Sequence, residues 1–218
     1  GREHALAWKL AQSKRIQIVL VAPGNGGTAI DPRLKNIFIT DPVQLADFAQ
    51  QEQVALTVVG PEAPLAAGIV DIFRERGLKI FGPTQKAAQL ESSKDFAKAF
   101  MHRHGIPTAK YQTFSDAAAA HKYTDQQGAP IVIKADGLAA GKGVVVAMTL
   151  DEAHGAVDMM LSDNRFGDAG ARVVIEEFLE GEEASFIVMV DGKNILPLAT
   201  SQDHKRLLDK DEGPNTGG

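Results

Sequence analysis

Two stretches of the sequence carry side chains suited to binding a nucleotide. The first, VIKADGLAAGKGVVVA at 132–147, holds three glycines and two lysines between two apolar runs. Backbone N–H groups of a glycine-rich turn can point toward phosphate oxygens, and a lysine supplies a point charge. The pattern therefore predicts a phosphate-binding loop, and a solvated surface hairpin is the alternative.

The spacing of the glycines excludes the common helical phosphate loop. Three residues separate Gly137 from Gly141, and Lys142 is followed by Gly143 rather than by Ser or Thr. A Walker A loop needs a longer spacing and a hydroxyl that binds magnesium, and it opens a helix. The residues that follow, VVVAM, favour a strand, so we expect a strand–loop–strand hairpin with Lys134 at the end of the incoming strand.

The second stretch, VVIEEFLEGEEASF at 173–186, begins with an apolar strand and continues into glutamates. Carboxylates such as Glu176 and Glu183 can accept hydrogen bonds from an adenine amino group or from ribose hydroxyls. A solvated acidic face is the alternative interpretation. The two stretches together are more specific than either one alone.

Composition excludes several classes of protein. The chain has 218 residues, is 44% hydrophobic and 23% charged, and carries a formal net charge of -5. These values favour a globular protein and give no basis for electrostatic binding to nucleic acid or to an anionic membrane. The absence of cysteine excludes disulfides and thiol chemistry and fits a cytoplasmic protein. The chain begins at Gly1 and ends on GPNTGG, so we expect further sequence at both ends.

The first part of the chain alternates between helical and strand patterns. This alternation predicts βαβ units with a parallel sheet, which binds ligands at the carboxyl ends of its strands. A helix that opens at Gly1 and Arg2 would present free N–H groups to an anion, and Leu6, Trp8 and Leu10 are candidates for its buried face. The expected helices are 2–12, 42–51 with Asp41 as N-cap, and 64–77, and the expected strands are 16–22, 54–60 and 78–82, with the loop PGNGG after the first strand.

Beyond a helix expected at 92–104, strand patterns dominate. We expect strands at 131–135, 144–148, 172–179 and 183–191, and one helix at 150–162. This order is typical of an α+β domain with antiparallel pairing. The change in pattern predicts a domain boundary near residue 92, with a Rossmann-like domain at 1–91 and a second domain at 92–218.

The residues also carry a resemblance to a known family. KADGLAAGKGV followed by IEEFLEGEEASF resembles the ATP-grasp fold. GREHALAWK, VAPGNGGTA, VGPEAPLAAGIVD, IFGPT, SQDHKR and GPNTGG, in this order, resemble the phosphoribosylamine–glycine ligase (glycinamide ribonucleotide synthetase) family. The resemblance runs over the whole chain and implies that residues 92–218 are an ATP-grasp domain, incomplete at its C-terminus, with a lid subdomain at about 108–178.

The resemblance implies a role for each matching residue. For ATP it implies Lys94 and Lys134 at the phosphates, Gly137, Gly141, Lys142 and Gly143 in the lid loop, Glu176, Phe178 and Leu179 at adenine, and Glu183 at ribose. For phosphoribosylamine it implies Gly1, Arg2, Glu62 and Pro64. For the junction where glycine meets the amine it implies Asp203, Lys205 and Arg206, with Asn215, Thr216 and Gly217. Without the resemblance, Lys94 would be read as a solvated helix residue.

The resemblance also implies a reaction and its partners. The family joins glycine to 5-phosphoribosylamine at the expense of ATP, in de novo purine biosynthesis, with Mg²⁺ or Mn²⁺. The metal ligands are expected beyond Gly218. We expect a cytoplasmic monomer with small-molecule substrates and no nucleic-acid or membrane partner.

Three other functions remain as alternatives. Another ATP-grasp carboxylate–amine ligase shares the nucleotide motifs but not GREH and DHKR. A nucleotide-binding regulator would bind ATP without chemistry. An NAD-dependent oxidoreductase fits the alternating pattern of the first part, but no G-x-G-x-x-G turn is visible in this sequence.

Overall fold

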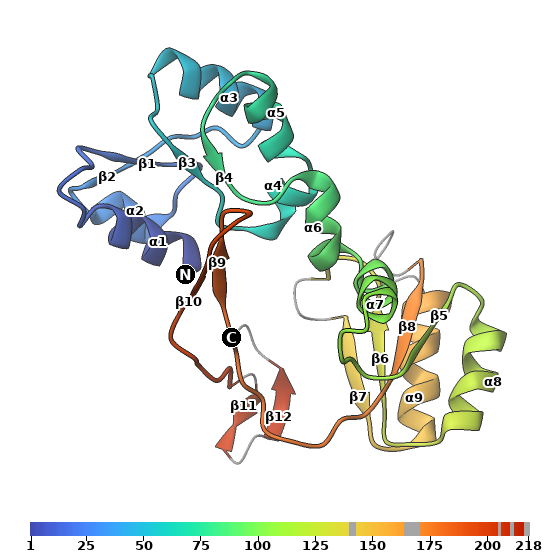
Figure 1. Ribbon diagram of the computed structural model, residues 1–218. Coiled ribbons are helices and arrows are strands. Elements are labelled where there is room, and N and C mark those ends of the chain that lie inside the picture. The colour runs from blue at the N-terminus through green and yellow to red at the C-terminus, as the bar shows by residue number, and fades with distance from the viewer. Residues whose placement is uncertain (140–142, 164–170, 205, 210–211, 216–218) are drawn as a thin grey trace. The chain divides into compact units, whose positions relative to one another are not determined.

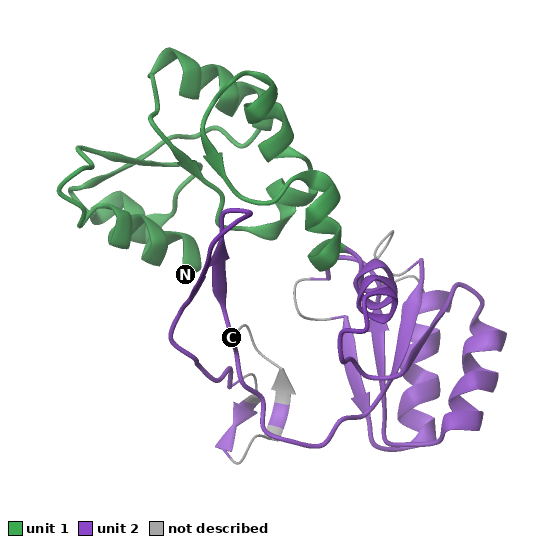
Figure 2. Cartoon of the chain, in the orientation of Figure 1, with its two compact units in different colours: residues 1–92 green, residues 93–218 purple. Residues whose placement is uncertain are grey.

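The computed structural model describes residues 1–139, 143–163, 171–204, 206–209 and 212–215 (Figure 1). The chain divides into two compact units, residues 1–92 and residues 93–218, shown in green and purple in Figure 2. Each unit has its own architecture.

The strands of the first unit form two parallel pairs. Strand β1 (Val19–Val21) pairs with β2 (Leu34–Asn36), and β3 (Thr57–Val58) pairs with β4 (Ile80–Phe81). The parallel arrangement confirms the sequence prediction. All three predicted strands are shorter than expected, because the ladders extend over only two or three residue pairs.

Helices join and cover these strands. They are α1 (Arg2–Leu10), α2 (Gly26–Ile30), α3 (Pro42–Gln51), α4 (Glu62–Ala66), α5 (Ile69–Glu75) and α6 (Gln85–Ser92). Helix α3 begins where the sequence predicts, since the Asp41 carboxylate accepts from the Gln44 amide at 2.8 Å and caps it. Small and apolar side chains of α3 and α5, with Phe73 the largest, pack together as the core of the unit.

Three expectations for this unit were wrong. The helix expected at 64–77 is two helices, because Gly68 adopts φ +87° and interrupts the hydrogen-bond ladder. The PGNGG stretch is not only a loop: Asn25 and Thr28 form a reciprocal capping box that starts α2. In α1 the buried residue is Ala7, while Leu6 and Trp8 are 40% and 48% exposed. Residues two apart point to opposite sides of a helix, so they cannot share a buried face.

The second unit is built on a four-stranded antiparallel sheet in the order β5–β8–β6–β7. The strands are β5 (Tyr111–Phe114), β6 (Ile131–Ala135), β7 (Val144–Ala147) and β8 (Val173–Glu177). Helices α8 (Ala117–Gln127) and α9 (Leu150–Val157) lie side by side along one face (Figure 1). The helix expected at 150–162 continues after α9 as a π-helical turn, η1 (Asp158–Ser162). Helix α7 (Lys94–Arg103) opens the unit, with Ser93 as N-cap.

The two faces of this sheet differ in chemistry. Successive side chains of a strand point to opposite faces. Ile131, Ile133, Val173 and Ile175 pack against α8 and α9 in the core. The alternate residues of the same strands include Lys134 and Glu176, so the polar side chains lie on the face that the core does not use.

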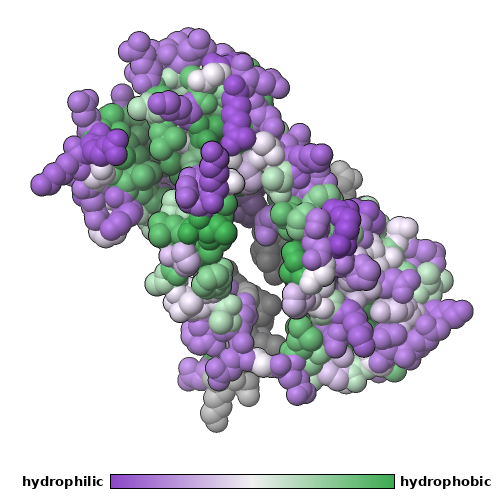
Figure 3. All heavy atoms as spheres, in the orientation of Figure 1, coloured by the Kyte–Doolittle hydropathy of each residue, from purple (hydrophilic) through white to green (hydrophobic). Residues whose placement is uncertain are grey.

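The last part of the chain forms two small hairpins. Strand β9 (Val188–Val190) pairs with β10 (Ile195–Pro197), and β11 (Arg206–Leu208) pairs with β12 (Glu212–Asn215), both antiparallel. The strand expected at 183–191 is therefore only three residues long. Apolar side chains of the β9–β10 hairpin are exposed, and Figure 3 shows hydrophobic residues gathered over it. Among the described residues, no helix has both the length and the apolar character needed to cross a membrane.

Candidate functional site

A buried carboxylate and two lysines form the centre of the polar sheet face. Glu176 on β8 is 6% exposed, and its Oε2 accepts a hydrogen bond from Lys134 Nζ at 3.0 Å and forms an ion pair with Lys98 Nζ at 2.9 Å. Lys134 comes from β6, and Lys98 comes from α7. The sequence prediction named Lys134 and Glu176 separately, and the structure brings them into contact.

The strand register explains this contact. Strands β6 and β8 pair so that Val132 lies opposite Glu176 and Lys134 lies opposite Val174. Glu176 and Lys134 are therefore diagonal neighbours on one face, within reach of a long side chain. The side chain of Lys134 is 26% exposed, whereas that of Glu176 is 7% exposed. The lysine thus extends from a buried carboxylate toward the surface, where it can meet an anionic ligand.

The first residues of the glycine loop form hydrogen bonds with the start of α7. Lys94 Nζ donates to the backbone oxygens of Gly137 at 3.1 Å and Asp136 at 3.4 Å. The Asp136 carboxylate, itself buried, accepts from the Asp95 amide at 2.8 Å and from Ser93 Oγ at 3.1 Å. A carboxylate at a helix N-terminus is favourable because the free amides and the helix dipole attract negative charge. These contacts place Lys94 beside the loop that was predicted to hold phosphate.

The far end of the loop closes tightly at Gly143. Its backbone oxygen accepts from the Ala135 amide at 2.8 Å, and β6 and β7 pair antiparallel as the predicted hairpin does. A Cβ at Gly143 would lie 2.6 Å from the Cβ of Ala139 and 3.1 Å from that of Ala135. Only glycine fits this approach. The predicted loop residues Gly141 and Lys142 lie outside the described residues.

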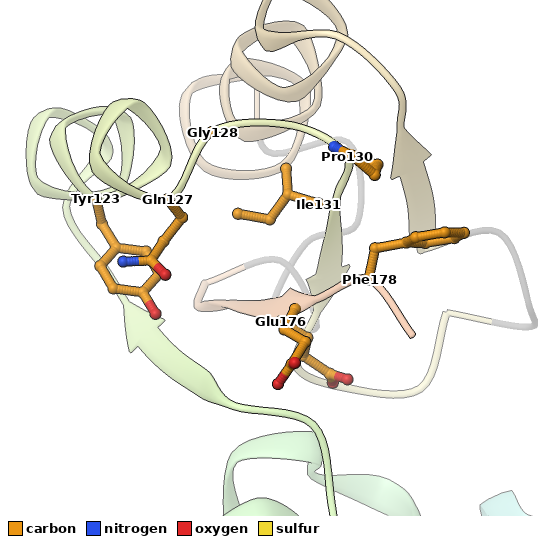
Figure 4. Close-up of a pocket in the computed structure, with 8 residues that line it drawn as sticks. Tyr123, Gln127, Gly128, Pro130, Ile131, Glu176 and Phe178 are labelled. Carbon is orange, nitrogen blue, oxygen red and sulfur yellow. The ribbon is translucent and has the colours of Figure 1, made fainter. Parts of the chain in front are cut away.

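The predicted adenine contacts follow directly after β8. Phe178 is partly buried, and Leu179 and Glu183 are exposed. In Figure 4, Tyr123 and Gln127 of α8 line one side of a cavity of about 160 Å³, with Glu176 and Phe178 on another side. Pockets for drug-sized ligands span about 300–1,000 Å³. This cavity is therefore too small to be a nucleotide site by itself, and the Lys134 side chain does not line it.

The first unit holds a second cluster, at the helix that opens the chain. Gly1 is the N-cap of α1, and Arg2 Nη2 donates to Glu62 Oε2 at 2.9 Å, so two predicted substrate residues are in contact. Hydrogen bonds to Glu3 and then to Glu62 raise the pKa of Arg2. The pKa of Glu62 is lowered, first by its own backbone amide and then by Arg2. Pro64 lies in the first turn of α4, near the same ion pair in sequence.

The residues predicted for the glycine and amine junction are only partly described. Arg206 on β11 lies opposite Asn215 on β12, so the backbone brings these two predicted residues together. Asp203 is partly buried in the segment that precedes β11. Lys205, Thr216 and Gly217 lie outside the described residues.

Sequence reasoning missed several residues of the polar face. Of these residues, Lys98 could have been predicted most easily, since it follows Lys94 by four residues and lies on the same face of the helix. Asp136 and Arg172 were also missed, and Arg172 Nη2 donates to Asp136 Oδ2 at 2.5 Å. Asp136 follows Lys134 by two residues, but its buried cap on α7 depends on tertiary contacts that spacing does not reveal. Among the described residues, no group of three His, Asp or Glu side chains is placed to hold a metal ion.

Two family models cover the chain. Residues 1–91 match the phosphoribosylglycinamide synthetase N domain, and residues 92–218 match the phosphoribosylglycinamide synthetase ATP-grasp (A) domain. The chain is 78% identical over its full length to a phosphoribosylamine–glycine ligase of Ralstonia nicotianae, covering 52% of that protein. It is 67% identical to the protein of that name from Escherichia coli K12, covering 51% of it. The chain thus spans about half the length of the curated relatives it matches.

Solved structures show the same fold. The crystal structure of a phosphoribosylamine–glycine ligase from Thermotoga maritima matches all of this chain with a TM-score of 0.79 and 34% identity, and the match covers 51% of that chain. The biotin carboxylase domain of a 2-oxoglutarate carboxylase from Hydrogenobacter thermophilus matches 95% of this chain, with a TM-score of 0.70 and 18% identity, and the match covers 49% of that domain. At that identity the likeness concerns the fold alone.

Proposed function

Because the chain belongs to the phosphoribosylglycinamide synthetase family, we propose that its protein joins glycine to 5-phosphoribosylamine with cleavage of ATP to ADP and phosphate. The product is glycinamide ribonucleotide, an intermediate of de novo purine biosynthesis. The observation that carries the proposal is the pairing of Lys134 with Glu176 beside the glycine hairpin, on the sheet face opposite the core.

The polar face of the second unit supplies the ATP site. Lys134 and Lys94 neutralise the phosphates, and the hairpin from Gly137 to Gly143 folds over them with its backbone amides. Glu176 accepts from the adenine amino group while the backbone of Phe178 and Leu179 meets the ring edge. Glu183 accepts from the ribose hydroxyls. Gly141 and Lys142 belong to this loop by the family motif.

The first unit supplies the site for phosphoribosylamine. Gly1 and Arg2 stand at the N-terminus of α1, where free amides and a guanidinium favour a phosphate. Glu62 holds Arg2 in place at 2.9 Å, and Pro64 lines the same ligand. The domains accordingly divide into residues 1–91, for the amine substrate, and residues 92–218, for ATP, with a lid at about 108–178.

The reaction needs activation because a carboxylate is a poor electrophile. The glycine carboxylate takes the γ-phosphate of ATP and becomes an acyl phosphate. The amine of phosphoribosylamine then forms the amide bond and expels phosphate. Asp203, Lys205, Arg206 and the segment from Asn215 to Gly217 orient the two reactants, and the closed hairpin excludes water that would hydrolyse the acyl phosphate.

A divalent cation, Mg²⁺ or Mn²⁺, would offset the charge of the phosphates in this reaction. Among the described residues, no three side chains are placed to ligate a metal ion. No contact described above therefore shows how this chain would bind the cation. The part of the charge neutralisation that we assign to this chain is that of Lys94 and Lys134.

The test is ADP release by the full-length protein with ATP, Mg²⁺, glycine and freshly prepared 5-phosphoribosylamine, omitting one component at a time. We expect release to require all four. Release that needs a different amine would support another ATP-grasp ligase, and ATP binding without amine-dependent release would support a regulator. We further expect a cytoplasmic monomer without nucleic-acid or membrane partners, and size-exclusion chromatography tests the monomeric state.

A further inference from the structure

Lys98 is a buried cation with no evident place in the proposed chemistry. It is 7% exposed and lies in the middle of α7. Its ammonium group forms an ion pair with Glu176 Oε2 at 2.9 Å and donates hydrogen bonds to Thr108 Oγ1 at 2.8 Å and to the backbone oxygen of Ala109 at 3.3 Å. An ammonium group has three protons. Two of them are donated to Thr108 and Ala109, and the buried ammonium is also paired with Glu176, so Lys98 faces groups of the protein rather than a ligand.

Lys134 differs from Lys98 in this respect. Its side chain is 26% exposed, against 8% for Lys98, and Glu176 Oε2 is its acceptor among the described residues. In the proposed function Lys134 turns to the phosphates when ATP binds. Glu176 would then lose one of two positive partners while remaining buried. A buried carboxylate without a positive partner is strongly unfavourable.

We infer that Lys98 is a positioning residue of the nucleotide site: it holds the Glu176 carboxylate in place and remains its positive partner when Lys134 moves to the ATP phosphates. Both lysines use Oε2, so Oε1 accepts no hydrogen bond from the described residues and is open to a ligand donor. The 6-amino group of adenine supplies such a donor, whereas guanine carries an acceptor oxygen at the same position. The inference rests on the proposed function, since it places the nucleobase at Glu176.

The position of Lys98 also explains why the carboxylate stays oriented. Its ion-pair partner Glu176 lies on β8 and its two hydrogen-bond acceptors lie in the segment before β5, while the lysine itself is on α7. The ring of Tyr111 on β5 lies 5.7 Å from the ammonium and adds a favourable cation–π contact. The Lys98 ammonium is therefore fixed from several sides, and Glu176 has little freedom to turn away.

The test uses the full-length protein with four variants: Lys98→Met, Lys98→Arg, Glu176→Gln and the double variant Lys98→Met/Glu176→Gln. Lys122→Met is the matched control, because Lys122 is an exposed lysine of the same unit. Nucleotide affinity is measured by displacement of a fluorescent ATP analogue, without glycine or phosphoribosylamine. The kcat/KM for ATP and for GTP gives the purine preference.

We expect Lys98→Met to weaken ATP binding at least tenfold and to reduce the preference for ATP over GTP, with kcat changed less than KM. Lys98→Arg should recover part of the loss. The double variant should bind ATP no worse than Lys98→Met, because a neutral glutamine needs no counter-charge. If Lys98→Met does not fold, the role of Lys98 is tested by comparing the double variant with Glu176→Gln. The double variant should then fold, and it should bind ATP as Glu176→Gln does.

An unchanged purine preference in Lys98→Met, or losses that multiply in the double variant, would overturn the inference. Wild-type protein that binds ATP but forms no glycinamide ribonucleotide would refute the proposed reaction and leave the binding comparison decisive for Lys98. Wild-type protein that binds no ATP would refute both.

Discussion

Replacing Asp136 by alanine should detach the glycine loop from the start of α7. The Asp136 carboxylate accepts from the Asp95 amide at 2.8 Å, from Ser93 Oγ at 3.1 Å and from Arg172 Nη2 at 2.5 Å. The variant Asp136→Ala leaves these donors without their acceptor. The loop carbonyls that receive Lys94 Nζ belong to Asp136 and to Gly137, so the loss should also reach the proposed phosphate site.

The magnitude is estimated from three terms. Leaving the Asp95 amide unsatisfied costs about 1–3 kcal/mol. Losing a carboxylate at the helix N-terminus costs about 0.3–1 kcal/mol more. The side chain of Arg172 is 47% exposed and can return to solvent, so its pair adds at most about 1 kcal/mol. Together these give a destabilisation of about 1–5 kcal/mol, centred on ~3 kcal/mol.

Differential scanning calorimetry of the full-length protein measures the effect. Asp136→Asn is the matched control, because its amide oxygen can still accept from the Asp95 amide while the negative charge is lost. We expect Asp136→Asn to lose about 1 kcal/mol, well under the loss in Asp136→Ala, and both variants to raise the KM for ATP. An alanine variant within about 0.5 kcal/mol of wild type, which is the range of neutral surface substitutions, would refute the reasoning, as would equal losses in the two variants.

Three further changes test other parts of the structure. Lys134→Ala should lower ATP turnover by about 10²–10³ with near-normal circular dichroism, and normal turnover would remove Lys134 from the mechanism. Gly143→Ala should collide with Ala139 and cost about 1–3 kcal/mol with a higher KM for ATP; an unchanged melting temperature would contradict the packing. Hydrogen bonds from Asn194 and Lys193 lower the pKa of Asp191 to about 2. The turn they form gains stability above the ordinary pKa of 3.8 and loses it as pH falls through about 2, so an NMR titration midpoint near 4 would contradict it.

Local chemistry explains what the sequence could predict. Helix α3 begins at its expected residue because Asp41 and Pro42 are neighbours that cap and open a helix without help from the rest of the chain. Strand β6 has its predicted bounds, since IVIKA lies between a turn and a glycine loop. The antiparallel hairpin followed from the glycine spacing and from the strand-forming residues after it.

Features that depend on distant partners could not be predicted in this way. The ion pair of Lys98 with Glu176 requires the register of β8 and the packing of α7 against the sheet. Neither can be predicted from the spacing of nearby residues in the sequence. Asp136 is a buried cap for a helix that lies far back along the chain. The start of α2 was also not predicted, but here the signal is local, because Asn25 and Thr28 carry the residue types of a capping box.

The alternation along β6 and β8 separates two kinds of constraint on the same strands. Ile133 and Ile175 are constrained by the volume available in the core, whereas Lys134 and Glu176 are constrained by their charges. A saturation mutagenesis library scored for ATP turnover should therefore show a tolerance profile with a period of two residues. Odd-numbered positions should accept other aliphatic side chains, and even-numbered polar positions should accept almost none. A protein engineer could thus repack the interior of this domain without touching its ligand chemistry, or alter its nucleotide preference without rebuilding its interior.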